Sequence, residues 1–324
     1  MSEILLDVRN LKKYYPVPSG TLHAVDDVTF TLNKGETLGI VGESGCGKST
    51  LGKTILRLTN PTSGQVFYGG RDIAAITDKE FVALRPELQM IFQDPMSSLN
   101  PRMSVKEQIE EPLIIYKRYP DRAEREKKVL ELMDTVGLAR RYAEMYPHEL
   151  DGGRRQRIGI ARGLALEPKL IVCDEPVSAL DVLIQAQILN LLMDLQQEKG
   201  LTYMFITHDL SVVKHISSNI CVMYLGQIVE QCETNRLFSH TLHPYTKALL
   251  SAIPVPSLNK KRERILLKGE LTSPINPKPG CRFAPRCIHA TEACFGTSPE
   301  LKDVGNGHKV ACHRVAELND LSDV

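Results

Sequence analysis

A glycine-rich loop set between an apolar run and a helical pattern constrains this chain more than any other feature. Residues 42–49 match the pattern G-x-x-x-x-G-K-[ST]. The apolar run 37–41 predicts a buried strand before the loop, and Leu51, Ile55 and Leu58 recur at helical spacing after it. Such a loop leaves backbone N–H groups free to wrap a pyrophosphate, and the helix N-terminus adds the positive end of its dipole. The sequence therefore predicts a nucleotide-phosphate site rather than a structural glycine turn.

The loop also carries the side chains that a bound nucleotide needs. Lys48 is expected to reach the β- and γ-phosphates, and the hydroxyl of Ser49 is expected to hold Mg²⁺. Gln93 follows another short apolar run and could reach the same metal and the attacking water, although alone it would be unremarkable. The nucleotide-binding residues predicted from the loop are Gly42, Glu43, Ser44, Gly45, Cys46, Gly47, Lys48, Ser49 and Thr50.

Two more apolar runs end in residues that are suited to catalysis. The run 170–173 reads as a central parallel strand and ends at Asp174 and Glu175, and the run 203–207 ends at His208. Ligands of doubly wound sheets bind at the carboxyl ends of strands. We therefore expect Asp174 to complete the Mg²⁺ shell, Glu175 to deprotonate the attacking water, and His208 to sense the γ-phosphate. Singly, most carboxylates are only solvated and most such histidines are structural, so the prediction depends on the combination.

Composition argues for a cytosolic protein and against nucleic acid as its partner. The 324 residues, 42% of them hydrophobic, suffice for one large domain and an appendage. The 40 basic and 39 acidic residues leave a net charge of +1, which does not favour a nucleic-acid-binding surface. No apolar run approaches the ~20 residues of a membrane span, and the start of the chain lacks the pattern of a signal peptide. We therefore expect membrane contacts to be made only through partners.

Secondary structure is predictable in several further segments. Residues 94–166 read as mainly helical, and a long helix is expected from Asp181 to its stop at Gly200. Residues 220–229 read as a hairpin, and residues 244–252 as a short helix that begins with proline.

Together these motifs resemble those of ATP-binding cassette (ABC) ATPases, and most closely the ATPase subunits of bacterial dipeptide and oligopeptide importers. The resemblance covers about residues 4–316. It rests on residues 42–49, Gln93, 174–176, 178–181 and His208, with residues 243–246 and the late cysteines marking the subfamily.

The resemblance implies an α/β fold of the ABC-type P-loop NTPases. This fold would combine a RecA-like core, an antiparallel β subdomain and a helical subdomain over about residues 94–166. The cassette is expected to span residues 1–235, and a small cysteine-containing C-terminal appendage is expected over residues 236–324.

The resemblance also implies residue roles and partners. Tyr15 would stack on adenine, although its position fits a buried strand aromatic as well. A dimer interface would be crossed by Ser178, Ala179, Leu180 and Asp181. The expected partners are a second homologous ATPase subunit, two transmembrane permease subunits and an extracytoplasmic substrate-binding protein. They would hold this chain as a peripheral protein at the cytoplasmic face of the inner membrane.

One loop departs from the family pattern. Residues 150–157 resemble the L-S-G-G-Q signature, which acts on the ATP held by the partner cassette, but Asp151 replaces the serine and Arg154 the glutamine around Gly152 and Gly153. An ionised Asp151 cannot donate to the γ-phosphate, and as a helix cap it would occupy the N–H groups itself. It would also repel phosphate unless Arg154 pairs with it. We expect a heterodimer with one consensus and one degenerate site; the alternative is a tolerated substitution with both sites active.

Four of the eight cysteines lie late in the chain, in a segment rich in proline and glycine. Such a segment has little apolar material to bury and needs a staple to fold. Four thiolates suit either tetrahedral Zn²⁺ or an iron–sulfur cluster, and free thiols remain an alternative. The resembling ATPases carry a [4Fe–4S] cluster at similarly placed cysteines, which favours that cofactor at Cys281, Cys287, Cys294 and Cys312.

The leading hypothesis is an ATP hydrolase that uses MgATP to power import of dipeptides or oligopeptides through a membrane complex. The alternatives are a related importer for nickel or another small solute, or a mainly regulatory subunit that hydrolyses ATP weakly. A soluble ABC protein of translation or DNA repair is disfavoured, because the chain has one cassette and no sustained heptads.

Overall fold

The computed structural model describes residues 3–253, 264–267, 269 and 273–321, and its contacts divide the chain into two compact units. Unit 1 comprises residues 1–33, 37–75 and 207–324, and unit 2 comprises residues 34–36 and 76–206. Both units contain strands and helices, so the predicted α/β class is confirmed. Within the described residues, no helix has the length and apolar character that crossing a membrane requires.

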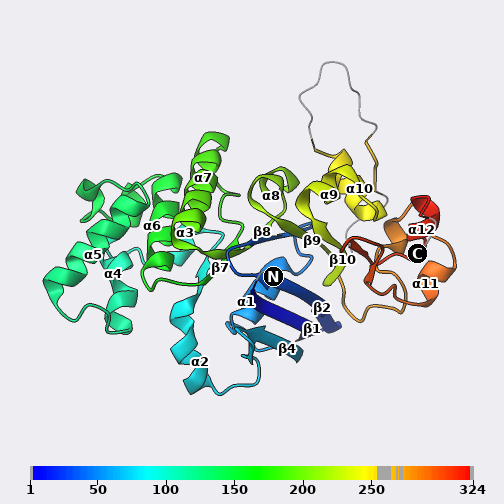
Figure 1. Ribbon diagram of the computed structural model, residues 1–324, viewed down its shortest axis with the longest axis horizontal. Helices are drawn as coiled ribbons and strands as arrows, with labels where there is room; N and C mark the ends of the chain where they lie inside the picture. The colour runs from blue at the N-terminus through cyan, green and yellow to red at the C-terminus, as the bar shows by residue number, and fades with distance from the viewer. Residues whose placement is uncertain (1–2, 254–263, 268, 270–272, 322–324) are drawn as a thin grey trace, which may run out of the picture. The chain divides into compact units, whose positions relative to one another are not determined.

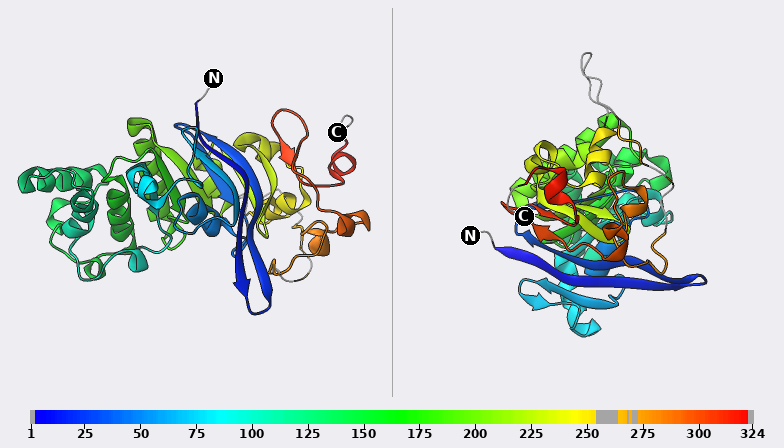
Figure 2. Two further views of the ribbon diagram at one scale, coloured as in Figure 1. Left: turned by 90° about the horizontal axis from the view of Figure 1, so that it is seen from below. Right: turned by 90° about the vertical axis from the view of Figure 1, so that its right-hand side faces the viewer.

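Unit 1 begins with a four-stranded antiparallel sheet in the order β2–β1–β4–β5. Its strands are β1 (Ile4–Val17), β2 (Gly20–Asn33), β4 (Ser63–Tyr68) and β5 (Arg71–Asp72). The first two form a long hairpin in which Val17 pairs with Gly20, and Figure 2 shows this hairpin twisting along its length. Burial alternates over part of this sheet, as at Val28, Phe30 and Leu32 of β2. This sheet matches the antiparallel β subdomain that the resemblance implies.

The strand before the glycine loop, β3 (Thr37–Val41), is buried over its whole length, as its apolar run predicts. In unit 1 it pairs in parallel with β9 (Asn219–Tyr224), which turns at Gly226 into the antiparallel β10 (Gln227–Glu233). The predicted hairpin is thus confirmed. Gly226 has a φ of 85°, a left-handed conformation that glycine adopts without a steric penalty. The helices of this part are α1 (Lys48–Ile55), α8 (Leu210–Ile216), α9 (Thr234–Ser239) and α10 (Pro244–Ser251).

The last part of unit 1 has little regular structure. Its elements are η4 (Ala284–Arg286), α11 (Ala293–Gly296), β11 (Lys302–Asp303), β12 (Lys309–Val310) and α12 (Val315–Leu318). β12 pairs with β10 and so attaches this segment to the sheet edge.

A buried polar network lies beside that edge. The fully buried carboxylate of Glu230 accepts hydrogen bonds from the Nε2 atom of His308 at 2.8 Å and from the backbone N–H groups of Leu242 at 2.8 Å and His243 at 3.2 Å. The Nε atom of Arg236 donates to Nδ1 of His308 at 3.2 Å. Because Nδ1 of His308 accepts from Arg236, Nε2 is the atom that donates to Glu230. The network joins the last segment of the chain to β10 and to the start of α10.

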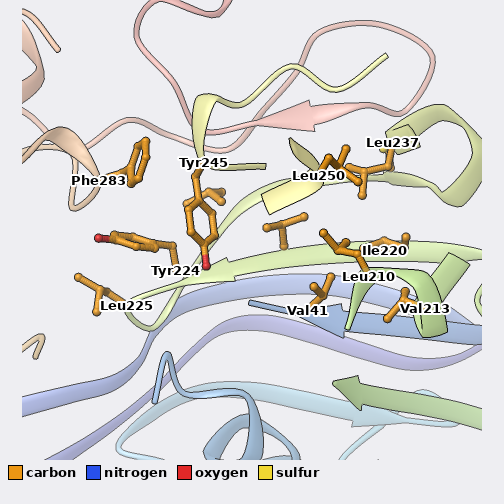
Figure 3. Packing of buried hydrophobic residues seen from close by; sticks show 13 residues of the cluster. Val41, Leu210, Val213, Ile220, Tyr224, Leu225, Leu237, Tyr245, Leu250 and Phe283 are labelled. Carbon is orange, nitrogen blue, oxygen red and sulfur yellow. The ribbon is translucent and has the colours of Figure 1, made fainter. Parts of the chain in front are cut away.

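An aromatic cluster forms the end of the core around β9 and α10 (Figure 3). Tyr224, Tyr245 and Phe283 are all at most 2% exposed. The Tyr224 and Tyr245 rings meet edge to face with centroids 4.7 Å apart, and Phe283 lies 5.3 Å from Tyr224 and 5.4 Å from Tyr245. Such contacts stabilise by about 0.5–1.5 kcal/mol each beyond the area they bury. The cluster packs the last segment of the chain firmly onto the core of unit 1.

Unit 2 combines parallel strands with a group of helices. The strands β6 (Leu88–Ile91), β7 (Leu170–Asp174) and β8 (Thr202–Thr207) pair in parallel, as the predicted apolar runs require. The helices are α2 (Asp78–Leu84), α3 (Pro95–Ser98), α4 (Val105–Ile115), α5 (Arg122–Thr135), α6 (Gly152–Leu164) and α7 (Val182–Lys199). Figure 1 shows α4, α5 and α6 packed side by side. Residues 94–166 are thus mainly helical, as predicted.

The predicted helix after Asp181 is confirmed together with its boundaries. The carboxylate of Asp181 accepts from the backbone N–H of Ile184 at 3.0 Å and so caps the first turn of α7. Gly200 ends the helix with a φ of 63°, a conformation that residues with a side chain rarely adopt.

Candidate functional site

The glycine loop joins β3 to α1 in unit 1, and its glycines are required by their surroundings. A Cβ atom on Gly42 would lie 2.1 Å from the carbonyl oxygen of Met223, and one on Gly47 would lie 2.0 Å from that of Ala24. Gly47 also has a φ of 106°. Only glycine allows this close approach of the backbone. The loop therefore has the local geometry that its spacing predicts.

Lys48 is 4% exposed and lies at the first position of α1. Its ammonium group donates to the carbonyl oxygens of Gly42 at 2.8 Å and Glu43 at 3.0 Å. The long side chain thus folds back over its own loop. Burial raises the pKa of the Cys46 thiol, although the charge of Lys48 opposes the effect, so this cysteine is a neutral residue inside the loop.

Glu43, the second residue of the loop, is held from outside the loop as well. Its backbone N–H donates to the hydroxyl of Tyr245 at 3.0 Å. Its carboxylate accepts from both terminal nitrogens of Arg286, at 2.6 and 3.0 Å. Sequence reasoning missed these contacts, because Tyr245 and Arg286 follow Glu43 by 202 and 243 residues and no periodic pattern joins them to the loop.

In unit 2, Glu175 follows β7 in a strained conformation. Its φ of 46° is uncommon for a residue with a side chain, and such strain concentrates at functional sites. Its carboxylate, in a residue that is 8% exposed, accepts from the Nε2 atom of Gln93 at 3.0 Å. Two residues that the sequence predicts for the same task, 82 positions apart, are thus brought together. Asp174 directly precedes Glu175 and is buried at the end of β7. His208 belongs to unit 1, follows β8 directly and is exposed.

The altered signature loop begins α6 in unit 2. One carboxylate oxygen of Asp151 accepts from the backbone N–H of Arg154 at 2.8 Å and so caps the helix, while the other is paired with the Arg154 guanidinium. The guanidinium also lies 4.9 Å from the centre of the Tyr142 ring. The expected cap and ion pair are both confirmed. A Cβ atom on Gly153 would lie 2.7 Å from the side chain of Ile184, so a larger residue would clash there.

The segment 178–181 between β7 and α7 is fixed by short polar contacts. The Ser178 hydroxyl donates to the carbonyl oxygen of Glu175 at 3.1 Å. Directly after the segment, Val182 and Leu183 are 78% and 77% exposed. Sequence reasoning missed this pair, whose signal is two adjacent apolar residues at the start of a helix.

Tyr15 lies on β1 and is half-buried. The ammonium group of Lys13 lies 4.7 Å from the centre of its ring. The neighbouring Tyr14 faces the other way and stacks on His23 with centroids 3.9 Å apart. Its hydroxyl bonds to Asp26, which also pairs with Arg282. This network was not predicted, because aspartate and arginine so far apart in the sequence give no local signal.

The four late cysteines line one small cavity in unit 1, together with His243, His289 and His313. Burial raises the pKa of the Cys281 thiol to about 11 and raises those of Cys287 and Cys312 as well. All eight cysteines are free. In the described residues, however, no three cysteine, histidine or acidic side chains lie close enough together to hold a metal ion. The expected metal centre at these cysteines is therefore not supported by their positions.

Comparison with protein families gives two matches. The family described as "ABC transporter" matches residues 25–178, and the family described as "Oligopeptide/dipeptide transporter, C-terminal region" matches residues 229–294. Tyr245 and Arg286 both fall within the second match.

Comparison with individual proteins extends over nearly the whole chain. The putative oligopeptide transport ATP-binding protein YkfD of Bacillus subtilis is 55% identical, with 95% of each chain covered. The dipeptide transport ATP-binding protein DppF of Escherichia coli is 48% identical, with 97% of this chain and 96% of that protein covered. Among solved structures, the ATP-binding cassette MJ0796, in a dimeric post-hydrolysis state bound to ADP and Pi, is 31% identical with a TM-score of 0.65. That match covers 71% of this chain and 98% of the other.

Proposed function

Since the chain belongs to the ATP-binding proteins of oligopeptide and dipeptide ABC transporters, we propose that it binds and hydrolyses ATP to power peptide import through a membrane complex. The observation that carries the proposal is the glycine loop between β3 and α1, with Lys48 folded over it. The peptide cargo follows from the relatives and from the C-terminal family match, since this chain itself would not touch the solute.

Each predicted residue would have a role in this activity. Lys48 would exchange its contacts with the loop carbonyls for the β- and γ-phosphates. Mg²⁺, held by Ser49, Gln93 and Asp174, would neutralise charge on the phosphate oxygens. Glu175 would accept the proton of the attacking water, and the amide of Gln93 orients its carboxylate.

His208 would contact the γ-phosphate, and Tyr15 would offer its half-exposed ring to adenine. The complete chain would lie at the cytoplasmic face of the membrane, with two permease subunits and an extracytoplasmic binding protein as partners. The segment from Ser178 to Asp181, followed by the exposed Val182 and Leu183, would face a second ATPase subunit.

Two substitutions test the ATPase in the purified full chain. Lys48→Ala should abolish binding of a non-hydrolysable ATP analogue in calorimetry, whereas Glu175→Gln should bind ATP and fail to hydrolyse it. Equal binding by Lys48→Ala and the unmodified chain would reject the nucleotide site. If ATP hydrolysis by a reconstituted complex responds to nickel-loaded rather than peptide-loaded binding protein, the transported solute is nickel and not a peptide. The ATPase assignment would be unaffected.

We also propose that this chain forms a heterodimer with one consensus and one degenerate ATP site. A carboxylate ~4 Å from phosphate at an effective dielectric of ~20 repels it by roughly 4 kcal/mol per unit charge pair. If the transition state experienced the full repulsion, hydrolysis would be about a thousandfold slower. The ion pair between Asp151 and Arg154 offsets part of that repulsion, and both side chains are about half exposed, so screening reduces it further. The site completed by this signature loop would therefore hold nucleotide and turn it over slowly.

The asymmetry has its own experiment in the assembled transporter. The general base is removed from each ATPase subunit in turn, and hydrolysis is measured at saturating ATP. Loss of Glu175 from this chain should be far more damaging than loss of the partner's base. Equal losses would mean that Asp151 is a tolerated substitution and that both sites hydrolyse ATP.

A third part of the proposal concerns Cys281, Cys287, Cys294 and Cys312, for which we infer an iron–sulfur cluster. Supporting it are the family resemblance and the single cavity that the four thiols share. The raised pKa values of Cys281, Cys287 and Cys312 mean that ligation would release protons, and the four thiols would have to draw closer than they now lie. Protein purified without oxygen should contain about four irons per chain, and Cys287→Ser should lose them. Stoichiometric zinc, or no metal, would reject the cluster.

A further inference from the structure

We propose that Arg286 and Tyr245 act as positioning residues for ATP binding, because they hold Glu43 and thereby fix the shape of the phosphate-binding loop. Neither residue belongs to a nucleotide motif, and both come from the C-terminal family region. The inference rests on the proposed ATPase function. It gives a role to the C-terminal family region, which contains none of the cassette motifs.

Glu43 is held at three of its groups. Tyr245 accepts from its N–H at 3.0 Å, and Arg286 donates twice to its carboxylate, at 2.6 and 3.0 Å. Its carbonyl oxygen accepts from Lys48 at 3.0 Å. The position of Glu43 therefore determines where the Lys48 ammonium rests, so Arg286 and Tyr245 influence the residue that is to bind the phosphates.

The ion pair with Arg286 is stronger than an ordinary surface pair. The side chains of Arg286 and Glu43 are 10% and 26% exposed, so water screens the pair only partly. The two parallel hydrogen bonds use the planar fork of the guanidinium, which lysine cannot reproduce.

The two positioning residues stand on rigid support. Tyr245 packs edge to face on Tyr224, and both contact Phe283 (Figure 3). Arg286 lies in the short helix η4, in which its backbone N–H donates to the carbonyl of Phe283 at 2.9 Å. The Arg286 guanidinium also lies 5.9 Å from the centre of the Tyr224 ring. A displaced η4 would therefore move the Glu43 anchor with it.

A second contact supports the same side of the loop. The backbone N–H of Gly226 donates to the carbonyl of Cys46 at 2.8 Å, and Arg282 bonds to the neighbouring carbonyl of Leu225. Residues from the C-terminal segment thus hold the loop directly at Glu43 and indirectly at Cys46.

Anchoring matters because the loop is rich in glycine. Each residue that must be ordered costs about 1–2 kcal/mol of backbone entropy, and glycine costs the most. A loop that is already fixed in the free protein does not lose this entropy again when nucleotide binds. Releasing Glu43 should therefore weaken nucleotide binding while leaving the chemical step unchanged.

The test measures the Kd of the Mg²⁺ complex of a non-hydrolysable ATP analogue by calorimetry on the full chain. Arg286→Ala and Glu43→Gln should each weaken binding about tenfold, the factor that corresponds to roughly 1.4 kcal/mol, and the double variant should be no weaker than either. Arg286→Lys should recover part of the affinity. In hydrolysis assays the KM should rise and kcat should stay near its original value.

Arg314→Ala is the matched control, because this arginine lies in the same segment and pairs with Glu317 rather than with the loop. It should bind the analogue as the unmodified chain does. Additive losses in the double variant, unchanged binding by Arg286→Ala, or equal losses in Arg286→Ala and Arg314→Ala would each overturn the positioning role. Unchanged binding by Lys48→Ala would instead overturn the nucleotide site itself, so the two failures are distinguishable.

Discussion

Replacing Glu230 by glutamine should loosen the last segment of the chain from the rest of unit 1. The carboxylate is fully buried and accepts three hydrogen bonds: two at one oxygen, from Leu242 N–H and His308 Nε2, and one at the other, from His243 N–H. A glutamine side chain has only one acceptor oxygen. In its best orientation the new NH₂ group faces the N–H of His243, which leaves two buried donors without an acceptor.

The magnitude follows from those two donors. Each buried polar group left unsatisfied costs about 1–3 kcal/mol, so Glu230→Gln should destabilise the segment by roughly 3 kcal/mol. The closely isosteric side chain leaves packing unchanged, so no cavity contributes. Glu300→Gln is the control, since Glu300 is 79% exposed and forms only a surface contact with Lys302. Its effect should stay below about 0.5 kcal/mol.

Native-state hydrogen exchange is the appropriate assay, because a chain of two compact units need not unfold in one step. A decrease of 3 kcal/mol in the free energy of local unfolding lowers the hydrogen-exchange protection factor about 150-fold. The decrease should be seen in peptides that contain the amides of Leu242 and His243 and should be absent from peptides of α5. Protection unchanged within threefold would refute the account of this network.

Three further results are expected. Glu175→Gln should retain MgATP and lower hydrolysis by about 10²–10⁴-fold in a phosphate-release assay. In the assembled transporter, Asp151→Ser should raise turnover at the site that this loop completes, whereas Arg154→Ala, which leaves the carboxylate without its ion pair, should lower it. Burial lowers the pKa of His243 from 6.5 to about 4, so its contribution to stability is complete above pH 6.5 and falls by up to about 1.4 kcal/mol per pH unit toward pH 4. Urea titrations should show this slope lost in His243→Asn and kept in His240→Asn.

The sequence predicts those parts of the fold whose signals are local. The strands at 37–41 and 170–173 are continuous apolar runs because parallel strands are covered on both faces, and the structure has β3 and β7 there. The glycine loop is defined by spacing within eight residues. Asp151 and Arg154 lie one helical turn apart, so their ion pair was also predictable.

Contacts between distant residues were not predictable, because no single-sequence pattern encodes them. The pairing of Arg286 with Glu43 and that of Arg282 with Asp26 depend on how whole elements fold together. The late cysteines are a different case. Their clustering in the sequence suggested a metal centre, whereas in the described structure they share a cavity without reaching ligand distances of one another.

The anchors of the phosphate-binding loop have a consequence for biosynthesis. Tyr245 and Arg286 are translated 202 and 243 residues after Glu43, so a ribosome that has just released the loop has not yet made either of them. Contacts between such distant residues form late in folding. The growing chain therefore carries its glycine loop unanchored until its last segment emerges. Premature termination before η4 would yield a polypeptide that contains every cassette motif and lacks the Arg286 anchor of its loop.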